Sequence, residues 1–348
     1  MPTLIDTERR RHTPSGLQFF CDNLLSGLSE LHATDIEVYG PEPAFGFPVH
    51  SYSPLHKLFN PLPKRFSLLH VTHQNQGCFP GKFGEKRILT VHDLNYLHLE
   101  ETNPKTKAAF IKQVAKNIDS ADHIVCISEY TKKDLLANAR YFPSLSDKPV
   151  TVIHNGLPVD PAYPAETLRR NLPTELRDTP YILNIGVSHP KKNQQAIIEA
   201  LPRLDMDVVL VVNDAQNGYA RYLKSRAAEL GVLPRLHFFE HVSDEVKHAL
   251  LAHCEVMIYP SIIEGFGYPP AEAMVYGRQV ILSKNGSLPE VGGEVAFYME
   301  DDSPWSVEEA FRKMQSSPVD AQSITKWVRR FSYQKMASSY LELYRALS

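Results

Sequence analysis

Short apolar runs alternate with helical patterns along the chain, and this alternation occurs twice. In the first half the strand-like runs cover residues 4–5, 36–39, 68–72, 88–91, 124–127 and 150–153, with helical patterns at 17–31 and 105–121. In the second half they cover 181–186, 208–213, 236–239, 256–259 and 279–283, with helical patterns at 193–201 and 219–230. Strands separated by helices form right-handed βαβ units and parallel sheets. The sequence therefore predicts an α/β protein with two Rossmann-like, doubly wound parallel sheets.

A proline-rich stretch, GLPVDPAYPAE at residues 156–166, separates the two series. Clusters of Pro and Gly are typical of linkers. We therefore expect a first domain at residues 1–160 and a second at 161–331. Two such domains facing a central cleft are the simplest arrangement, with ligands at the carboxyl ends of the strands. Two further helical patterns, at 306–315 and 322–347, have no strand after them.

Composition excludes several classes of protein. Lys and Arg total 37 and Asp and Glu total 40, so the net charge of −3 provides no basic field for nucleic acid. The four cysteines form no C-x-x-C pair, and we expect reduced thiols in a cytoplasmic protein. The first residues turn charged at once, unlike a signal peptide. No run approaches the ~18 apolar residues of a membrane span.

Basic residues gather in the first half of the chain, and this bears on membrane contact. They are Arg9, Arg10, Arg11, Lys57, Lys64, Arg65, Lys82, Lys86 and Arg87. Each basic residue near an anionic bilayer contributes about 1 kcal/mol of attraction. Any single cluster is more simply explained as a solvated face. Peripheral contact with the cytoplasmic face of a membrane is thus left open.

The densest chemical signal is YPSIIEGFGYPPAEAMVYG at residues 259–277. A strand ends at Pro260, a loop carries Glu264, and Pro269-Pro270 opens a helix with Glu272 in its first turn. Glycine allows close backbone approach, and the N–H groups and dipole of a helix start favour an anion. Two carboxylates then reach different parts of one ligand beside a phosphate. A glycine-rich fingerprint for dinucleotides and a P-loop are both absent.

This segment resembles the donor-site motif of the retaining glycosyltransferases of family four, which have the GT-B fold. Further blocks follow in the family's order, at residues 90–98, 124–136, 152–160, 181–201, 241–256 and 286–298. They look most like bacterial surface-polysaccharide and lipopolysaccharide mannosyltransferases. The resemblance implies that residues 332–348 cross back and complete the N-terminal, acceptor-binding domain. Residues 161–331 would then bind the nucleotide-sugar donor.

The resemblance also implies a role for each matching position. Glu272 would hold the ribose hydroxyls, and Lys192 would neutralise the leaving diphosphate. The transferred sugar would meet Glu264 and the backbone of Gly265, Phe266 and Gly267. Val242 would lie by the base and Gly16 by the donor phosphates. On the acceptor side the matching residues are His92 and Asp93, and the ring of His92 could donate to or accept from a sugar hydroxyl.

One position departs from the family. Many members carry an Arg directly after the glycine that ends the first strand of the second domain, where this chain has Val187. Lys191 is the candidate substitute for that cation. His70 and His73 are candidate metal ligands by residue type, but residues three apart on a strand point to opposite faces. We expect no metal cofactor. Ser128-Glu129 is interpreted as a helix cap.

The implied activity is transfer of a hexose from a nucleotide diphosphate with retention of configuration. A double displacement would need a nucleophilic carboxylate, and Glu264 is the candidate by charge. The family geometry favours front-face attack instead. GDP-mannose is the expected donor and a glycan or lipid-linked glycan the expected acceptor. The alternatives are a UDP-sugar donor, a nucleotide-sugar epimerase or phosphorylase on the same fold, and a sugar-binding protein without chemistry.

Overall fold

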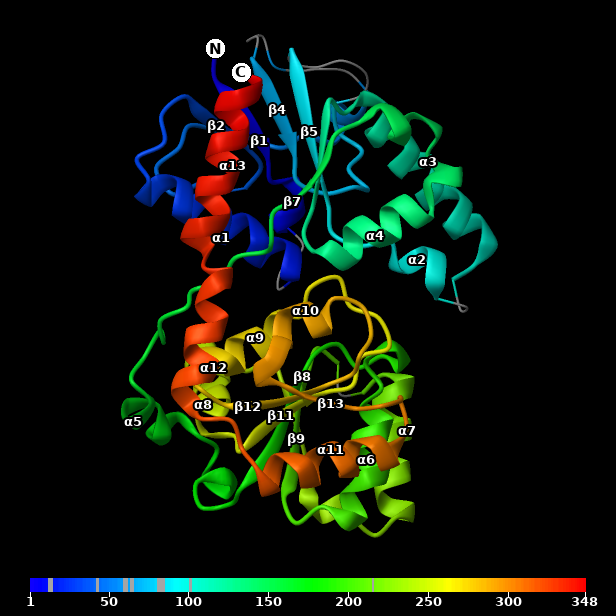
Figure 1. Ribbon diagram of the computed structural model, residues 1–348, viewed down its shortest axis with the longest axis vertical. Helices are drawn as coiled ribbons and strands as arrows, with labels where there is room; N and C mark the ends of the chain where they lie inside the picture. The colour runs from blue at the N-terminus through cyan, green and yellow to red at the C-terminus, as the bar shows by residue number, and fades with distance from the viewer. Residues whose placement is uncertain are drawn as a thin grey trace. The chain divides into compact units, whose positions relative to one another are not determined.

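The computed structural model describes residues 1–11, 15–41, 44–58, 62, 66–79, 85–99, 102–214 and 216–348. The chain forms two compact units. Residues 1–157 and 331–348 make the first, and residues 158–330 make the second. Each is built on one sheet in which every described strand pair is parallel. The predicted α/β class with doubly wound parallel sheets is confirmed (Figure 1).

The first unit has a sheet in the order β3-β2-β1-β4-β5-β6-β7. Its strands are β1 (Thr3–Asp6), β2 (Ile36–Tyr39), β3 (Val49–His50), β4 (Leu68–Val71), β5 (Lys86–Val91), β6 (His123–Cys126) and β7 (Val150–Val152). Its helices are α1 (Gly16–Glu30), α2 (Asn95–His98), α3 (Pro104–Ser120), α4 (Glu129–Ala137) and α13 (Tyr333–Leu347). The order reverses at β1, which pairs with β2 on one side and β4 on the other.

Side chains that alternate along the strands give this sheet two buried faces. Ile88 packs in a cluster with α1 and α13, and its neighbour Leu89 packs in a cluster with α3. Figure 1 shows α1 and α13 together on one side of the sheet, with α3 and α4 on the other. A parallel sheet covered on both faces explains why its strands read as continuous apolar runs.

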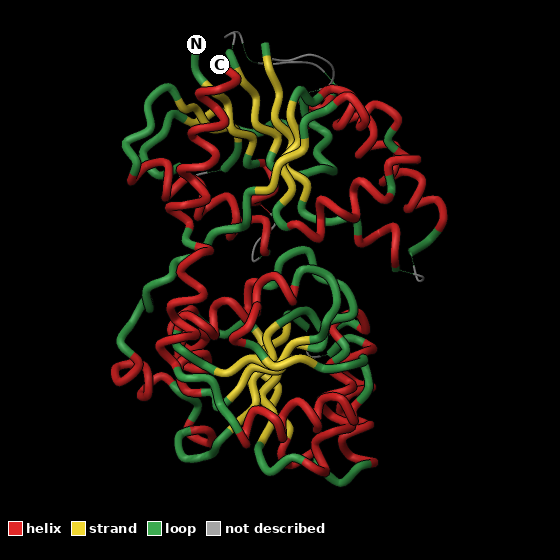
Figure 2. Tube along the Cα trace, in the orientation of Figure 1, coloured by secondary structure: helices red, strands yellow, loops and turns green. Residues whose placement is uncertain are grey.

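The second unit has a sheet in the order β10-β9-β8-β11-β12-β13. Its strands are β8 (Tyr181–Ile185), β9 (Asp207–Val212), β10 (Leu236–Glu240), β11 (Val256–Tyr259), β12 (Gln279–Leu282) and β13 (Phe297–Tyr298). Its helices are α5 (Ala165–Leu168), α6 (Gln194–Ala200), α7 (Gly218–Glu229), α8 (Asp244–His253), α9 (Tyr268–Val275), α10 (Leu288–Gly292), α11 (Pro304–Ser316) and α12 (Ala321–Val328). Figure 2 shows the strands inside and the helices around them.

The sequence predicted a single helical pattern over residues 322–347, but the structure has two helices there. α12 ends at Val328, a single 3₁₀ turn covers Arg329–Phe331, and α13 begins after Ser332. The Ser332 hydroxyl accepts a hydrogen bond from the Lys335 N–H at 3.2 Å, so it caps α13 and stops the upstream helix from continuing. The two-residue strands β3 and β13 are too short to leave a periodic signal. No described helix has both the length and the apolarity to cross a bilayer.

Candidate active site

The strand order of the second unit reverses at β8. β8 lies between β9 and β11, so the chain leaves it toward one edge and later returns to its other side. Ligands of open parallel sheets bind at the carboxyl ends of strands at such a switch point. The loops after β8 and β11 carry Lys192 and Glu264. The topology therefore brings two predicted site residues to one place.

Lys192 and Glu264 form a partly buried ion pair there. The Lys192 Nζ donates to the Glu264 Oε2 at 2.5 Å and to the Tyr259 hydroxyl at 2.8 Å. Lys192 is only 8% exposed. Burial lowers the pKa of its ammonium, but Glu264 and Tyr259 raise it by more, so the pKa lies above its usual value and the group is charged. We call Lys192, Tyr259 and Glu264 the charged cluster.

The loop that carries Glu264 is held in place by hydrogen bonds from Ser287, the residue before α10. The Ser287 N–H donates to the Glu264 carbonyl at 3.1 Å, and the Ser287 hydroxyl hydrogen is shared between the Glu264 carbonyl at 3.1 Å and the Phe266 carbonyl at 2.8 Å. Gly286 has a φ of +62°, and a Cβ there would lie 2.4 Å from the Glu264 carbonyl oxygen. Only glycine fits at this contact.

The start of α9 corrects one prediction. The helix begins at Tyr268, one residue before the prolines, and Gly267 with a φ of +105° is its N-cap. Pro269 and Pro270 carry no N–H, so Tyr268 is the only one of the first three helical residues that has one. The next N–H, that of Ala271, already donates to the Gly267 carbonyl at 3.4 Å, so this helix start offers an anion fewer N–H groups than the sequence predicted. Glu272 also lies beyond the first turn.

Glu272 is 8% exposed and has a partner that the sequence did not reveal. Its Oε1 accepts a hydrogen bond from the Lys247 Nζ of α8 at 2.6 Å. The two residues are 25 positions apart, and a lysine in an amphipathic helix ordinarily indicates only a solvated face. Val242, in the loop after β10, is partly buried at the carboxyl end of that strand.

Val187, the position that lacks the family's Arg, and Lys191, its candidate substitute, differ in their surroundings. Val187, where many family members have Arg, is 38% exposed. The Lys191 carbonyl accepts a hydrogen bond from the Ile262 N–H at 2.8 Å, which ties the loop after β8 to the loop after β11. Among the described residues, the Lys191 ammonium has no hydrogen bond or ion pair. Lys191 stays the candidate for the second cation.

In the first unit, His92 and Asp93 follow β5 as predicted from the sequence. The His92 Nε2–H donates to the Thr72 carbonyl at 2.8 Å, and the His92 backbone N–H donates to the Gln74 Oε1 at 3.0 Å. Burial lowers the pKa of His92 to about 4, so the ring is neutral near pH 7. Because Nε2 carries the proton, Nδ1 can only accept a hydrogen bond. We call Thr72, Gln74 and His92 the neutral cluster.

The other first-unit candidates are partly resolved by their contacts. Gly16 is the first residue of α1, after the N-cap Ser15; residues 12–14 of the same loop lie outside the described residues. The His70 ring is bonded to the hydroxyls of Tyr344 and Thr90, at 2.6 and 2.8 Å, which is a structural role. Within the described ranges, no three His, Cys, Asp or Glu side chains converge as a metal site would require.

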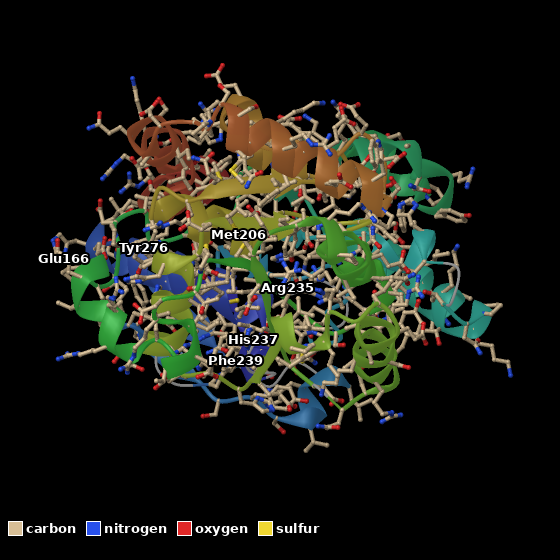
Figure 3. All side chains as sticks on the ribbon, turned by 90° about the horizontal axis from the view of Figure 1, so that it is seen from below. Glu166, Met206, Arg235, His237, Phe239 and Tyr276 are labelled. Carbon is tan, nitrogen blue, oxygen red and sulfur yellow. The ribbon has the colours of Figure 1, made fainter. Side chains whose placement is uncertain are left out.

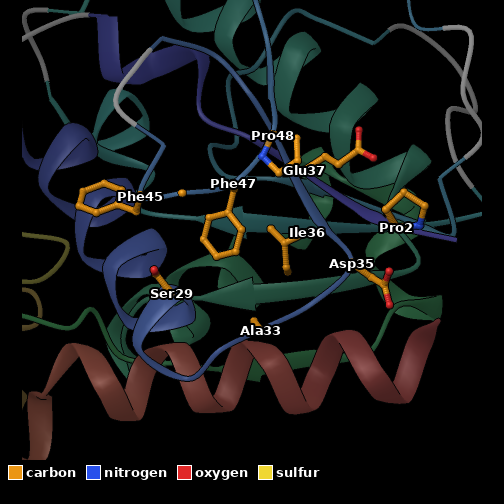
Figure 4. Close-up of a pocket in the computed structure, with 10 residues that line it drawn as sticks. Pro2, Ser29, Ala33, Asp35, Ile36, Glu37, Phe45, Phe47 and Pro48 are labelled. Carbon is orange, nitrogen blue, oxygen red and sulfur yellow. The ribbon is translucent and has the colours of Figure 1, made fainter.

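Two cavities lie away from these residues. One, of about 630 Å³, is lined by Pro2, Asp35 and Ile36, which stand at the amino ends of β1 and β2 (Figure 4). The other, of about 440 Å³, is lined by Met206 and Glu255, which precede β9 and β11. Met206 is labelled in Figure 3. Ligands of parallel sheets bind at the opposite, carboxyl ends, so neither cavity lies where the site is expected.

Two of the basic residues expected near a membrane are buried. Arg10 is 4% exposed and its Nη2 lies 2.7 Å from Asp22, and Arg87 is 5% exposed and bonded to the Phe79 carbonyl. Neither can meet a lipid headgroup. Lys64, Arg65 and Lys82 lie outside the described residues.

Two family models match the chain, one on each side of the linker. The model of Glycosyltransferase Family 4 matches residues 18–161, and the model of Glycosyl transferases group 1 matches residues 168–330. Together they cover most of the chain. The chain belongs to the family 4 glycosyltransferases.

The sequence relatives include enzymes of O-antigen synthesis. O-antigen chain mannosyltransferase B of Escherichia coli is 25% identical over 278 residues, which are 76% of this chain and 71% of that protein. O-antigen chain mannosyltransferase RfbU of Salmonella typhimurium is 24% identical over 270 residues, 73% of this chain and 72% of that protein.

Solved structures show the same fold over the whole chain. Sucrose-phosphate synthase from Thermosynechococcus elongatus has a TM-score of 0.77 at 18% identity and covers 100% of this chain and 99% of its own. HepE of Anabaena, solved in complex with UDP and glucose, has a TM-score of 0.75 at 16% identity and covers 99% of this chain and 100% of its own. The predicted GT-B fold is confirmed.

Proposed function

We propose that this glycosyltransferase is a retaining mannosyltransferase, which moves mannose from GDP-mannose to a glycan or lipid-linked glycan in polysaccharide or lipopolysaccharide biosynthesis. The observation that carries the proposal is the ion pair of the buried Lys192 with the partly buried Glu264 at the switch point of the second unit. An ammonium binds a diphosphate oxygen, and a carboxylate accepts from sugar hydroxyls. The similarity to two O-antigen mannosyltransferases supports mannose.

The roles of the site residues follow from their chemistry. The second unit, residues 161–331 in the predicted division, binds the donor, and the first unit binds the acceptor. On the donor side, Glu272 holds the ribose, Val242 lies by the base, Gly265, Phe266 and Gly267 face the sugar, and Lys191 supplies a second cation. Gly16 approaches the donor phosphates, and His92 and Asp93 serve the acceptor side. Lys192 neutralises the charge that builds on the diphosphate, and no metal cofactor is included.

The proposed reaction is a front-face displacement. The bond between the anomeric carbon and the β-phosphate oxygen breaks, and the acceptor oxygen bonds to the same face of that carbon. The acceptor proton passes to the leaving phosphate oxygen. A double displacement needs a strongly nucleophilic carboxylate. The Glu264 Oε2 already accepts from Lys192 and Tyr259, which lowers its nucleophilicity and favours the front-face route.

The expected setting is a reducing one. All four cysteines are buried and free, which supports a cytoplasmic protein. Peripheral contact with the inner face of a membrane stays a proposal, carried by basic residues other than Arg10 and Arg87.

A UDP-sugar donor is the second candidate, and the UDP bound to HepE favours it. Thermal unfolding in the presence of GDP, UDP, ADP and their sugars separates the two. A ligand at one hundred times its dissociation constant stabilises a protein by about 2.7 kcal/mol. We expect GDP and GDP-mannose to raise the melting temperature. A rise with UDP and none with GDP would exclude GDP-mannose.

A further inference from the structure

Tyr259 is the last residue of β11, at the carboxyl end of the strand next to β8. Its side chain is 3% exposed. The aromatic ring packs as a core residue of a buried strand would, but the hydroxyl contacts both charged groups of the site. Nothing in the sequence singles it out, because a tyrosine in an apolar strand ordinarily has a packing role.

The phenol contacts Lys192 and Glu264 in complementary ways. Its oxygen accepts a hydrogen bond from the Lys192 Nζ at 2.8 Å, and its O–H donates to the Glu264 Oε2 at 3.3 Å. The Lys192 Nζ also lies 4.9 Å from the centre of the Tyr259 ring. Burial raises the pKa of Tyr259 to about 12, so the hydroxyl keeps its proton. The phenol is thus the neutral member of a three-way network.

In the proposed function the donor competes with the ion pair for hydrogen bonds, and this competition is the reason that the Tyr259 hydroxyl is needed. When a nucleotide sugar binds, Lys192 turns its hydrogen bonds toward the diphosphate and Glu264 turns toward sugar hydroxyls. The attraction between the two then weakens. The Tyr259 hydroxyl is a partner that neither group has to give up, so it keeps the buried ammonium and the carboxylate in place while their mutual bond is exchanged for bonds to the donor.

We propose that Tyr259 is a positioning residue, whose hydroxyl fixes Lys192 and Glu264 for catalysis. This inference rests on the proposed function of that pair. Without the hydroxyl, a buried ammonium loses one hydrogen bond of the charged kind. The geometry needed in the transition state is lost more than the binding of the ground state. The expected signature is therefore a fall in kcat with little change in KM.

The test compares Tyr259→Phe with Tyr181→Phe. Tyr181 is a matched control because it is also buried, lies on the neighbouring strand β8, and donates from its hydroxyl to the Leu250 carbonyl at 2.9 Å. Both variants keep the ring and lose one hydroxyl. Initial rates of GDP release from GDP-mannose are measured with n-octyl α-mannoside as acceptor, and both variants are crystallised without ligand.

We expect Tyr259→Phe to lower kcat by about ten- to a hundred-fold, the loss of one hydrogen bond to a charged group, with KM for GDP-mannose changed less than about threefold. Tyr181→Phe is expected to retain the wild-type kcat. In the Tyr259→Phe crystal, the Lys192 Nζ moves from its wild-type position. A Tyr259→Phe protein whose Lys192 and Glu264 superpose on the wild type, or whose kcat falls no further than that of Tyr181→Phe, overturns the inference.

The two proposals fail in different ways. If the wild-type protein does not release GDP from GDP-mannose, the proposed function fails on this donor. The crystal structures still decide whether Tyr259 positions the pair, because they need no substrate.

Discussion

The charged cluster of the second unit and the neutral cluster of the first both stand at the carboxyl ends of central strands, in two sheets of the same design. The charged cluster lies at the ends of β8 and β11 and the neutral cluster at the ends of β4 and β5, and every side chain of the two except the partly buried Glu264 is buried. The charged cluster holds an ammonium and a carboxylate around one phenol. The neutral cluster holds an uncharged imidazole between a carbonyl and an amide. The same scaffold therefore provides either charge or uncharged hydrogen bonding, according to a few loop residues.

This difference suits a division of labour between the units. A diphosphate leaving group builds negative charge as the reaction proceeds, and a fixed cation stabilises it. In the proposed function the acceptor glycan offers hydroxyl groups, and a neutral acceptor such as the His92 Nδ1 is suited to bind them because it has no charge to desolvate. Changes in the charged cluster should then affect turnover most, and changes in the neutral cluster should affect it less.

The largest effect is expected from Lys192→Ala. This change removes the only cation of the charged cluster, and we expect turnover of GDP-mannose to fall by about 10²–10³-fold or more, as for loss of one preorganised transition-state donor. The fold should survive, because Lys192 lies in the loop after β8 and its replacement leaves the strands and helices of the unit unchanged. GDP release measures the rate and circular dichroism the fold. Lys191→Ala is the control, and its loss should be smaller. Near-normal turnover by Lys192→Ala would refute its assignment.

Glu264→Ala should come next. The carboxylate is expected to bind sugar hydroxyls, so its removal should cost most of the turnover while GDP alone binds normally. Calorimetric titration with GDP and with GDP-mannose separates the two effects. Glu264→Ala also leaves the Lys192 ammonium with Tyr259 as its one remaining partner in the charged cluster. If the variant turned over GDP-mannose at close to the wild-type rate, neither a sugar-binding nor a nucleophilic role for Glu264 could stand.

Most of the fold was predictable, and the site only in part. Buried parallel strands leave apolar runs, so the strand cores were found, whereas β3 and β13 were too short to show. Glu264 and Glu272 share one loop and helix and were visible in the sequence. Tyr259 and Lys192 are 67 residues apart, and Ser287 and Phe266 are 21 apart, so these contacts exist only once the sheet has formed. The helix start at Tyr268 was missed because proline suits several early helical positions.

In the neutral cluster, His92→Gln tests the protonation of the ring. The folded-state pKa of about 4 lies below the ordinary histidine value of 6.5, so between these values the unfolded chain binds more protons. The His92 contribution to stability is thus present above about pH 6.5 and is lost as the pH falls toward 4. Asp6, whose pKa burial raises to about 7, acts in the opposite direction, so the comparison with the variant isolates His92. Urea unfolding at pH 7 and pH 5 should show the wild type losing more stability than His92→Gln.

The turnover of His92→Gln should fall by less than that of the charged-cluster variants. Glutamine retains a hydrogen-bond acceptor but not the fixed ring. An equal loss of stability in both proteins between pH 7 and pH 5 would mean that His92 is protonated in the fold.

The smallest effects are expected where neutral side chains only hold backbone in place, and here the two units should behave alike. Ser287→Ala leaves the Phe266 carbonyl without its 2.8 Å donor, and Gln74→Ala leaves the His92 N–H without its acceptor. Each change unmakes a buried neutral hydrogen bond, which costs about 1–3 kcal/mol of unfolding free energy. Because Ser287 holds the loop of Glu264, its variant should also lower turnover by a few-fold. The contrary outcome is that the two variants lose equal stability but Gln74→Ala loses more turnover than Ser287→Ala. That result would reverse the ranking of the two clusters and would place the more demanding chemistry in the first unit.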